Sequence, residues 1–436
     1  MIGTLLVLHL AVLALLFKQV EASVGRILGL VFLVYMLVFT VIKPALLYYY
    51  DLYLPYSTND DSAVTSLLVG SLIFLVVQSL ALRVLMPRPL SRHLRDCFDL
   101  SGATPRGVQV MFLVFMVVSF VGGVLRFHDV GYLWSGQSTF DATASLAGGS
   151  WYINYIAEML VYGTTAATAY TYYRHRTFKS LLILIGLLAL TYMWSKLVAR
   201  TGVLVALIAW LSCYFSPARQ RALNILYIAG FGYVLLILLY VGNFVRLGNI
   251  QDINPQTALF GAIVAAGADI APVDNATLLY AEMDKHPSTD FVQLAGAATP
   301  LVLVPSSIFP FKIPPDKDSE LNRIFFPEGA DTAFYHEGSM LTFTVPASGY
   351  ADAGFIGVAV SSLVYAVILC VYARIFRYGT ASARYIAASY LLIHIVGYRL
   401  SVETMLMSFW SSFLFIGIAR WIALTASHSR QPLAAH

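Results

Sequence analysis

Two cations one helical turn apart interrupt the apolar stretch MWSKLVARTG. Lys196 and Arg200 are four residues apart, so they lie on the same face of a helix. Inserting a cationic residue within an apolar span costs roughly 2.5–3.5 kcal/mol of free energy on insertion scales. Such a residue is therefore usually found where it can bind an anion. The pair therefore predicts an anion-binding position. The alternative is that each side chain only snorkels to the membrane interface.

An imidazole and a carboxylate stand side by side later in the chain, at His336 and Glu337 in the sequence HEG. Gly349, Gly354 and Gly357 follow and allow close backbone approach at the start of the next apolar run. A solvated cap is one interpretation of this segment. Its position directly before a span also suits a site at the membrane face.

The elements that must position these residues are membrane helices. The 436 residues are 59% hydrophobic and only 11% charged, whereas soluble domains carry about 25% charged residues. A span needs about 20 apolar residues. We therefore predict an all-α polytopic integral membrane protein, with residues 1–436 as one domain and about eleven transmembrane helices, near 2–17, 26–49, 63–86, 107–125, 151–173, 181–196, 202–216, 223–243, 353–373, 384–398 and 405–426.

Basic residues predict the orientation of these helices. They concentrate in alternate turns, at Lys18/Arg26, Arg88/Arg92/Arg95/Arg106, Arg174/Arg176/Lys179, Arg219/Arg221, Arg374/Arg377/Arg384 and Arg430. The positive-inside rule places those turns inside, the N-terminus outside and the C-terminus inside. The outer turns are then 50–62, 126–150, 197–201, 244–352 and 399–404.

Several cations fall at the outer ends of helices in this orientation, namely Arg126, Lys196, Arg200, Arg246, Lys312, Arg323 and Arg399. Charge-assisted hydrogen bonds to phosphate are strong, and arginine binds phosphate in a forked geometry. A ring of such side chains would make an anion site.

Residues 244–352 form a long outer loop that is rich in proline. Its segment VPSSIFPFKIPP, residues 304–315, is apolar but broken by proline every four or five residues. It cannot form a regular helix. We expect interfacial segments here, and the apolar stretches 256–272 and 291–311 could re-enter the bilayer.

Other classes of site have little support. The three cysteines, Cys97, Cys213 and Cys370, lie in or beside apolar runs without metal-ligand or paired spacing, so we expect no disulfide framework and no metal site. No basic tract interleaved with aromatics indicates nucleic-acid binding. We expect no cofactor.

The pairing of VPSSIFPFKIPP with the downstream HEG and GYADAGFIG resembles the O-antigen polymerase (Wzy) family, nearest to its enterobacterial common antigen polymerase branch. The likeness extends to LTYMWSKLVARTGVLVALIAWL, NFVRLGN, YRLSVETMLMSF and RFHDVGYLW. Phe309 stands at the family's aromatic position, but Pro314 and Pro315 follow where one proline is usual. The stretch 294–300, LAGAATP, lacks an expected arginine, so another cation such as Lys312 would have to replace it.

This resemblance implies a GT-C-like membrane glycosyltransferase in the bacterial inner membrane, with an active site that faces the periplasm and needs no metal. It would transfer a growing glycan from undecaprenyl diphosphate to the sugar of a new lipid-linked repeat unit. A flippase and a polysaccharide chain-length regulator are the implied partners in polysaccharide and lipopolysaccharide biosynthesis.

The resemblance also implies roles for the candidate residues. Cations would stabilise the diphosphate leaving group as its charge grows, and these are Lys196, Arg200, Arg246, Lys312 and Arg399. His336 is the first choice for the base that accepts the hydroxyl proton, since imidazole titrates near neutral pH. Glu337, Asp352 and Glu403 are the alternatives.

Two other functions remain open. An O-antigen ligase would use the same lipid-diphosphate donor and a similar long outer loop, although the proline motif favours a polymerase. A lipid-linked oligosaccharide transporter or flippase would show related halves with broken helices and polar midplane residues. The sequence shows no repeat, and His394 is the main mid-span ionisable residue that it suggests.

The predicted topology can be tested by labelling single cysteines in a background without Cys97, Cys213 and Cys370. Cysteines at Ser138 and Asp331 should react with an impermeant thiol reagent in cells whose outer membrane has been permeabilised. Cysteines at Ser91 and Thr177 should not react, because they lie in inner turns. Labelling at Thr177 but not at Asp331 would invert the topology.

Overall fold

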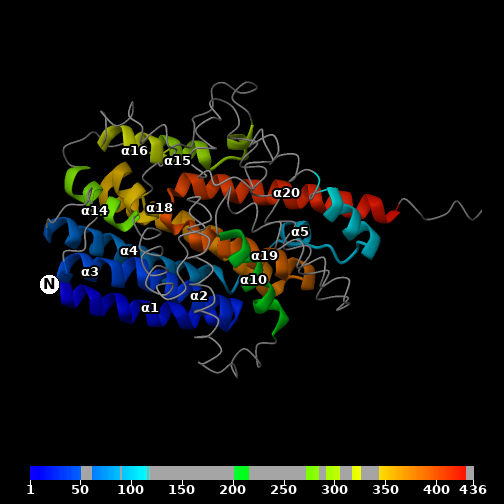
Figure 1. Ribbon diagram of the computed structural model, residues 1–436, viewed down its shortest axis with the longest axis horizontal. Coiled ribbons are helices and arrows are strands. Elements are labelled where there is room, and N and C mark those ends of the chain that lie inside the picture. Colours follow the sequence, from blue (N-terminus) through cyan, green and yellow to red (C-terminus); the bar gives the residue numbers. More distant parts are fainter. Residues whose placement is uncertain are drawn as a thin grey trace, which may run out of the picture. The chain divides into compact units, whose positions relative to one another are not determined.

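The computed structural model describes residues 1–50, 61–88, 91–114, 117, 201–215, 272–283, 291–304, 317–325 and 343–428. Every regular element in these ranges is a helix (Figure 1). Among the described residues, five helices are long and apolar enough to cross a membrane: Ile2–Val24, Arg26–Tyr49, Asp61–Leu85, Val345–Tyr378 and Val402–Ser427. The chain is a helical multi-pass membrane protein, which confirms the predicted class.

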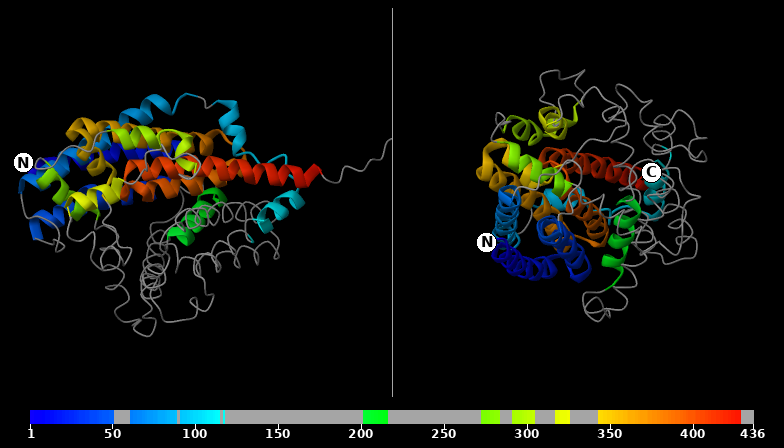
Figure 2. Two further views of the ribbon diagram at one scale, coloured as in Figure 1. Left: turned by 90° about the horizontal axis from the view of Figure 1, so that it is seen from above. Right: turned by 60° about the vertical axis from the view of Figure 1, so that its left-hand side comes forward.

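The chain divides into two compact units. The first unit comprises Met1–Arg88, Ala266–Val371 and His394–Trp410, and the second comprises Pro89–Ala265, Tyr372–Ile393 and Ser411–His436. In the first unit, α1 (Ile2–Val24) packs against both α2 (Arg26–Leu37) and α4 (Asp61–Leu85). These helices lie side by side in Figures 1 and 2. Gly25, at φ 84°, makes the turn between α1 and α2.

The second span is not a uniform α-helix. A π-helical segment, η1 (Val38–Ile42), separates α2 from α3 (Lys43–Tyr50). Pro44 explains this segment, because proline lacks an N–H and its ring clashes with the carbonyl four residues earlier. The Thr40 hydroxyl donates to the Met36 carbonyl at 2.7 Å within the same stretch. The break places Lys43 at the start of α3, inside the predicted span 26–49.

The helix labelled α18 (Val345–Tyr378) contains a sharp reversal. Ala353 (φ −157°, ψ 39°) and Gly354 (φ 58°, ψ −141°) have non-helical backbone angles. The Ser361 hydroxyl donates to the Val345 carbonyl at 3.3 Å, which a straight helix would not allow across sixteen residues. Residues 345–352 therefore fold back on the helix that starts at 355. We call 345–361 the hairpin and 345–352 its first arm.

Two glycines let the arms of the hairpin approach closely. A Cβ atom at Gly349 would collide with the Gly357 carbonyl and the Ser361 hydroxyl, and a Cβ atom at Gly357 would collide with the Gly349 carbonyl. The glycines in GYADAGFIG thus form the hairpin. The predicted span 353–373 corresponds to the second arm, and the first arm was not expected.

The remaining described helices follow the predictions closely. They are α10 (Thr201–Tyr214), α19 (Ala381–Val396), η7 (Gly397–Arg399) and α20 (Val402–His428). They overlap the predicted spans 202–216, 384–398 and 405–426, and of these helices α20 is long and apolar enough to cross a membrane. The predicted spans 151–173, 181–196 and 223–243 lie outside the described residues.

Parts of the predicted loop 244–352 are helical and belong to the first unit. They are α14 (Pro272–Glu282), α15 (Val292–Ala297), η5 (Pro300–Leu303) and α16 (Lys317–Phe325). Helix α14 packs against α4. The Trp410 indole donates to the Ala297 carbonyl at 3.2 Å. The described part of this loop is therefore anchored to the spanning helices.

In the second unit, the turn after α5 (Arg92–Cys97) is centred on Asp99. The Asp99 carboxylate accepts hydrogen bonds from the Ser101 N–H and the Thr380 hydroxyl, both at 2.8 Å. Partial burial acts to raise the pKa of Asp99, but hydrogen bonds from Ser101, Thr380 and Ser382 outweigh it and hold the pKa below its ordinary value. The Arg420 guanidinium donates to the Asp99 carbonyl at 3.1 Å, which ties this turn to α20.

The hairpin turn predicts a position-specific effect of removing glycine. A Cβ atom would have open space at both Gly354 and Gly417, but only Gly354 has a positive φ. Gly354→Ala should lower the free energy of unfolding by about 1–3 kcal/mol, because this backbone region is essentially restricted to glycine. Gly417→Ala, in the interior of α20, is the control and should stabilise by up to about 1 kcal/mol. Thermal unfolding in detergent measures both, and equal effects would contradict the hairpin.

Candidate functional site

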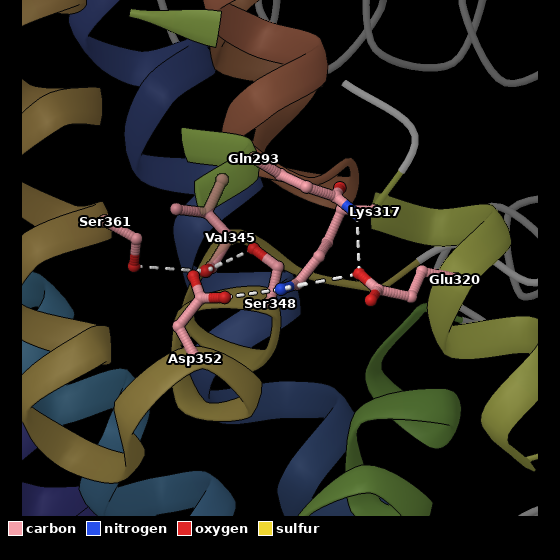
Figure 3. Close-up of polar contacts among 7 residues, drawn as sticks. All are labelled: Gln293, Lys317, Glu320, Val345, Ser348, Asp352 and Ser361. Atoms are coloured by element: carbon pink, nitrogen blue, oxygen red, sulfur yellow. Dashed lines mark hydrogen bonds and ion pairs between the residues drawn. The ribbon is translucent and has the colours of Figure 1, made fainter. Parts of the chain in front are cut away.

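The turn of the hairpin carries a buried ion pair. Asp352 ends the first arm and is only 3% exposed. Its carboxylate accepts a hydrogen bond from the ammonium of Lys317, the first residue of α16, which is completely buried. Figure 3 shows the two side chains pointing toward each other. Such a pair persists in an apolar interior because each charge compensates the other.

Lys317 also connects Asp352 to the other loop helices. Its ammonium lies 3.9 Å from the Glu320 carboxylate one turn further along α16. The Gln293 amide on α15 donates to that carboxylate at 2.6 Å (Figure 3). A continuous series of polar contacts therefore joins α15, α16 and the hairpin.

A serine hydroxyl of the second arm bonds to the backbone of the first arm. Ser348 and Ser361 both donate to the Val345 carbonyl, at 3.0 and 3.3 Å (Figure 3). A buried carbonyl without a partner is costly, so these bonds stabilise the start of the arm. The Ser361 bond also fixes the register of the two arms, whereas the Ser348 bond lies within the first arm.

A second buried ion pair lies elsewhere in the first unit. The Lys43 ammonium is 2.9 Å from the Asp274 carboxylate, and the two side chains are 9% and 1% exposed. Asp274 lies in the first turn of α14, where the helix dipole also favours a negative charge. The pair joins the second span to a helix of the predicted outer loop.

Arg399 and Glu403 flank the connection between α19 and α20. Arg399 ends η7 and is partly buried, and Glu403 is buried in the first turn of α20. The ring of Tyr398 lies 5.6 Å from that of Phe39 and 4.9 Å from that of Phe74, which come from the middles of two spans.

This connection thus packs against two spanning helices of the first unit. Its placement in an outer turn at 399–404 stays a prediction. Helix α19 has 16 residues. Helix η7 follows it directly and extends the helical run to Arg399. Together α19 and η7 are about 30 Å long, close to the thickness of a hydrocarbon core.

Three of the residues predicted to form the site are described: Asp352, Glu403 and Arg399. The other six, His336, Glu337, Lys196, Arg200, Arg246 and Lys312, lie outside the described residues. The structure pairs Asp352 with Lys317, a residue that the sequence analysis did not single out. Within the described ranges, no group of three or more histidine, cysteine or acidic residues could hold a metal ion.

The sequence analysis missed both ion pairs for different reasons. Lys43 lies inside a predicted span, so its position alone was a signal for an intramembrane partner. Lys317 stands in the charged run DKDSE, which resembles a solvated turn. Only the fold shows that this lysine is buried.

Comparisons of the chain with protein-family models, with curated proteins and with solved structures found no match. The assignment of a function therefore depends on the residues and their geometry.

The Lys43–Asp274 pair can be tested through stability. Lys43→Met should lower the free energy of unfolding by about 3–5 kcal/mol, because it leaves the buried Asp274 carboxylate uncompensated. Lys43→Met with Asp274→Leu should recover most of that loss, since an apolar pair needs no compensation. Lys18→Met, at an exposed position on α1, is the control. Thermal unfolding in detergent compares the variants, and a double variant no better than Lys43→Met would contradict the pairing.

Proposed function

We propose that the chain is a polysaccharide polymerase of the bacterial inner membrane. It transfers a growing glycan from undecaprenyl diphosphate to a new lipid-linked repeat unit at the periplasmic face. In this proposal the fold is GT-C-like, with about eleven spans, and residues 244–352 are periplasmic.

The geometry of the hairpin is the main support for this proposal. GYADAGFIG, one of the segments on which the family resemblance depends, forms a tight reversal at the head of a spanning helix. The buried Asp352 lies within this segment, bonded to a lysine of the preceding loop. The segment thus combines irregular backbone with ionisable groups at the entry to a span, a combination typical of functional sites in membrane proteins.

The proposed reaction needs a base and a set of cations. A hydroxyl oxygen of the acceptor sugar attacks the anomeric carbon while the bond from that carbon to the diphosphate oxygen breaks. The hydroxyl proton passes to the base, for which His336, Glu337, Asp352 and Glu403 are the candidates, and the diphosphate leaves with the bonding electrons. Arg399, with Lys196, Arg200, Arg246 and Lys312, stabilises its growing charge.

Reconstitution with lipid-linked substrate tests the proposal. The purified protein in proteoliposomes should convert undecaprenyl-diphosphate-linked repeat units into a ladder of longer glycans on gels. Transfer only after addition of a lipid A core acceptor would indicate a ligase instead. Movement of the substrate across the bilayer without lengthening would indicate a flippase.

Variants of Arg200 test whether glycan lengthening depends on the proposed cations. Arg200→Ala should slow lengthening by roughly ten- to a hundredfold, the equivalent of one charge-assisted hydrogen bond in the transition state. Arg200→Lys should also be impaired, because lysine keeps the charge but loses the planar fork. Lys18→Met is again the control at matched protein levels. Wild-type ladders from Arg200→Ala would remove Arg200 from the site.

A further inference from the structure

Lys317 is the buried residue whose role the proposed chemistry leaves open. We propose that Lys317 is a positioning residue that holds the hairpin against α16, and that Asp352 is its counter-ion rather than a proton acceptor. The positioning role depends on geometry alone. The statement about proton transfer rests on the proposed function.

The two ends of α16 meet the two ends of the first arm. Lys317, at the start of α16, bonds to Asp352 at the end of the arm. Phe325, at the end of α16, has its ring centroid 6.2 Å from that of Phe343, just before the arm begins. Helix α16 and the first arm therefore run antiparallel, side by side.

The lengths of the two segments match this arrangement. Nine residues of α16 and the eight residues 345–352 each extend about 12–14 Å at 1.5 Å per residue. A contact at each end is enough to fix one short helix along the other. Helix α16 thus lies along the first arm and holds it in place, with the Lys317–Asp352 pair at one end and an aromatic contact at the other.

The surroundings of Asp352 suit a counter-ion better than a base. A general base must come within hydrogen-bonding reach of the hydroxyl whose proton it accepts. The Asp352 carboxylate is instead buried and directed at Lys317 (Figure 3). Lys317 is itself completely buried, so removing the carboxylate would leave its charge without compensation.

Cross-linking of the hairpin tests the positioning role without any assay of function. Ser348→Cys with Ser361→Cys places two thiols where both hydroxyls now reach the same carbonyl oxygen. In a background with Cys97, Cys213 and Cys370 replaced by serine, copper phenanthroline should join them. The disulfide is measured as thiols protected from alkylation after unfolding. Ser348→Cys with Ser362→Cys is the matched control, because the next residue on a helix points about 100° away.

Substitutions at Lys317 are then added to the cysteine pair. Lys317→Met should reduce cross-linking several-fold or prevent accumulation of the protein, and Lys317→Arg should largely preserve it. Lys317→Met with Asp352→Leu should restore both accumulation and cross-linking, since no buried charge remains. Unchanged cross-linking in Lys317→Met, or no recovery in the double variant, would overturn the positioning role.

The ladder assay tests the role of Asp352. The double variant should keep kcat within about tenfold of the wild type with the same pH profile, whereas loss of a general base costs roughly 10²- to 10⁴-fold. A double variant that cross-links normally but loses kcat to that extent would make Asp352 the base. If the wild type makes no ladder, the proposed function fails, and the cross-linking result still decides the role of Lys317.

Discussion

Charges buried among apolar helices need partners inside the protein, and this constraint determines where the loop helices of this chain lie. Moving an ion out of water costs several kcal/mol, and an opposite charge in good geometry offsets that cost. In both buried pairs, one partner lies on a short helix of the predicted outer loop, α14 or α16, and the other lies on a helix long enough to span a membrane. Helix α16, KDSELNRIF, is held both by the Lys317 ion pair and by apolar contact, since Leu321 is buried and the Phe325 ring lies near that of Phe343.

The same constraint applies to the backbone where a span is irregular. Pro44 removes a hydrogen bond within the second span, and the chain responds with the π-helical segment. At Ala353 and Gly354 the helix reverses, and the Ser361 hydroxyl bonds to a carbonyl of the first arm. Non-helical backbone at such positions is tolerated where protein surrounds it. Each irregularity thus has a local cause in the sequence and a buried partner in the fold.

Hydropathy predicted the positions of the five described candidate spans, because the length of an apolar run is a local property. The predicted 26–49 and 63–86 correspond closely to Arg26–Tyr49 and Asp61–Leu85. The first arm of the hairpin was missed, since its register depends on contacts between Val345 and Ser361 rather than on apolar length. The partners of Lys43 and Asp352 were also missed. Position 43 is distant from position 274 in the sequence, and one sequence gives no signal that joins them.

The two ion pairs also limit which cations could serve the proposed reaction. Lys43 and Lys317 each face a carboxylate, so their positive charge is compensated where it lies. A diphosphate would have to displace that carboxylate and leave it buried, which costs several kcal/mol. These lysines therefore contribute little to the electrostatic stabilisation of a leaving diphosphate. In the proposed function that role is assigned to Arg399, which is next to Tyr398 of the buried aromatic cluster, and to the four predicted cations outside the described residues. Buried lysines position the loop, and arginines with forked geometry are better suited to bind phosphate.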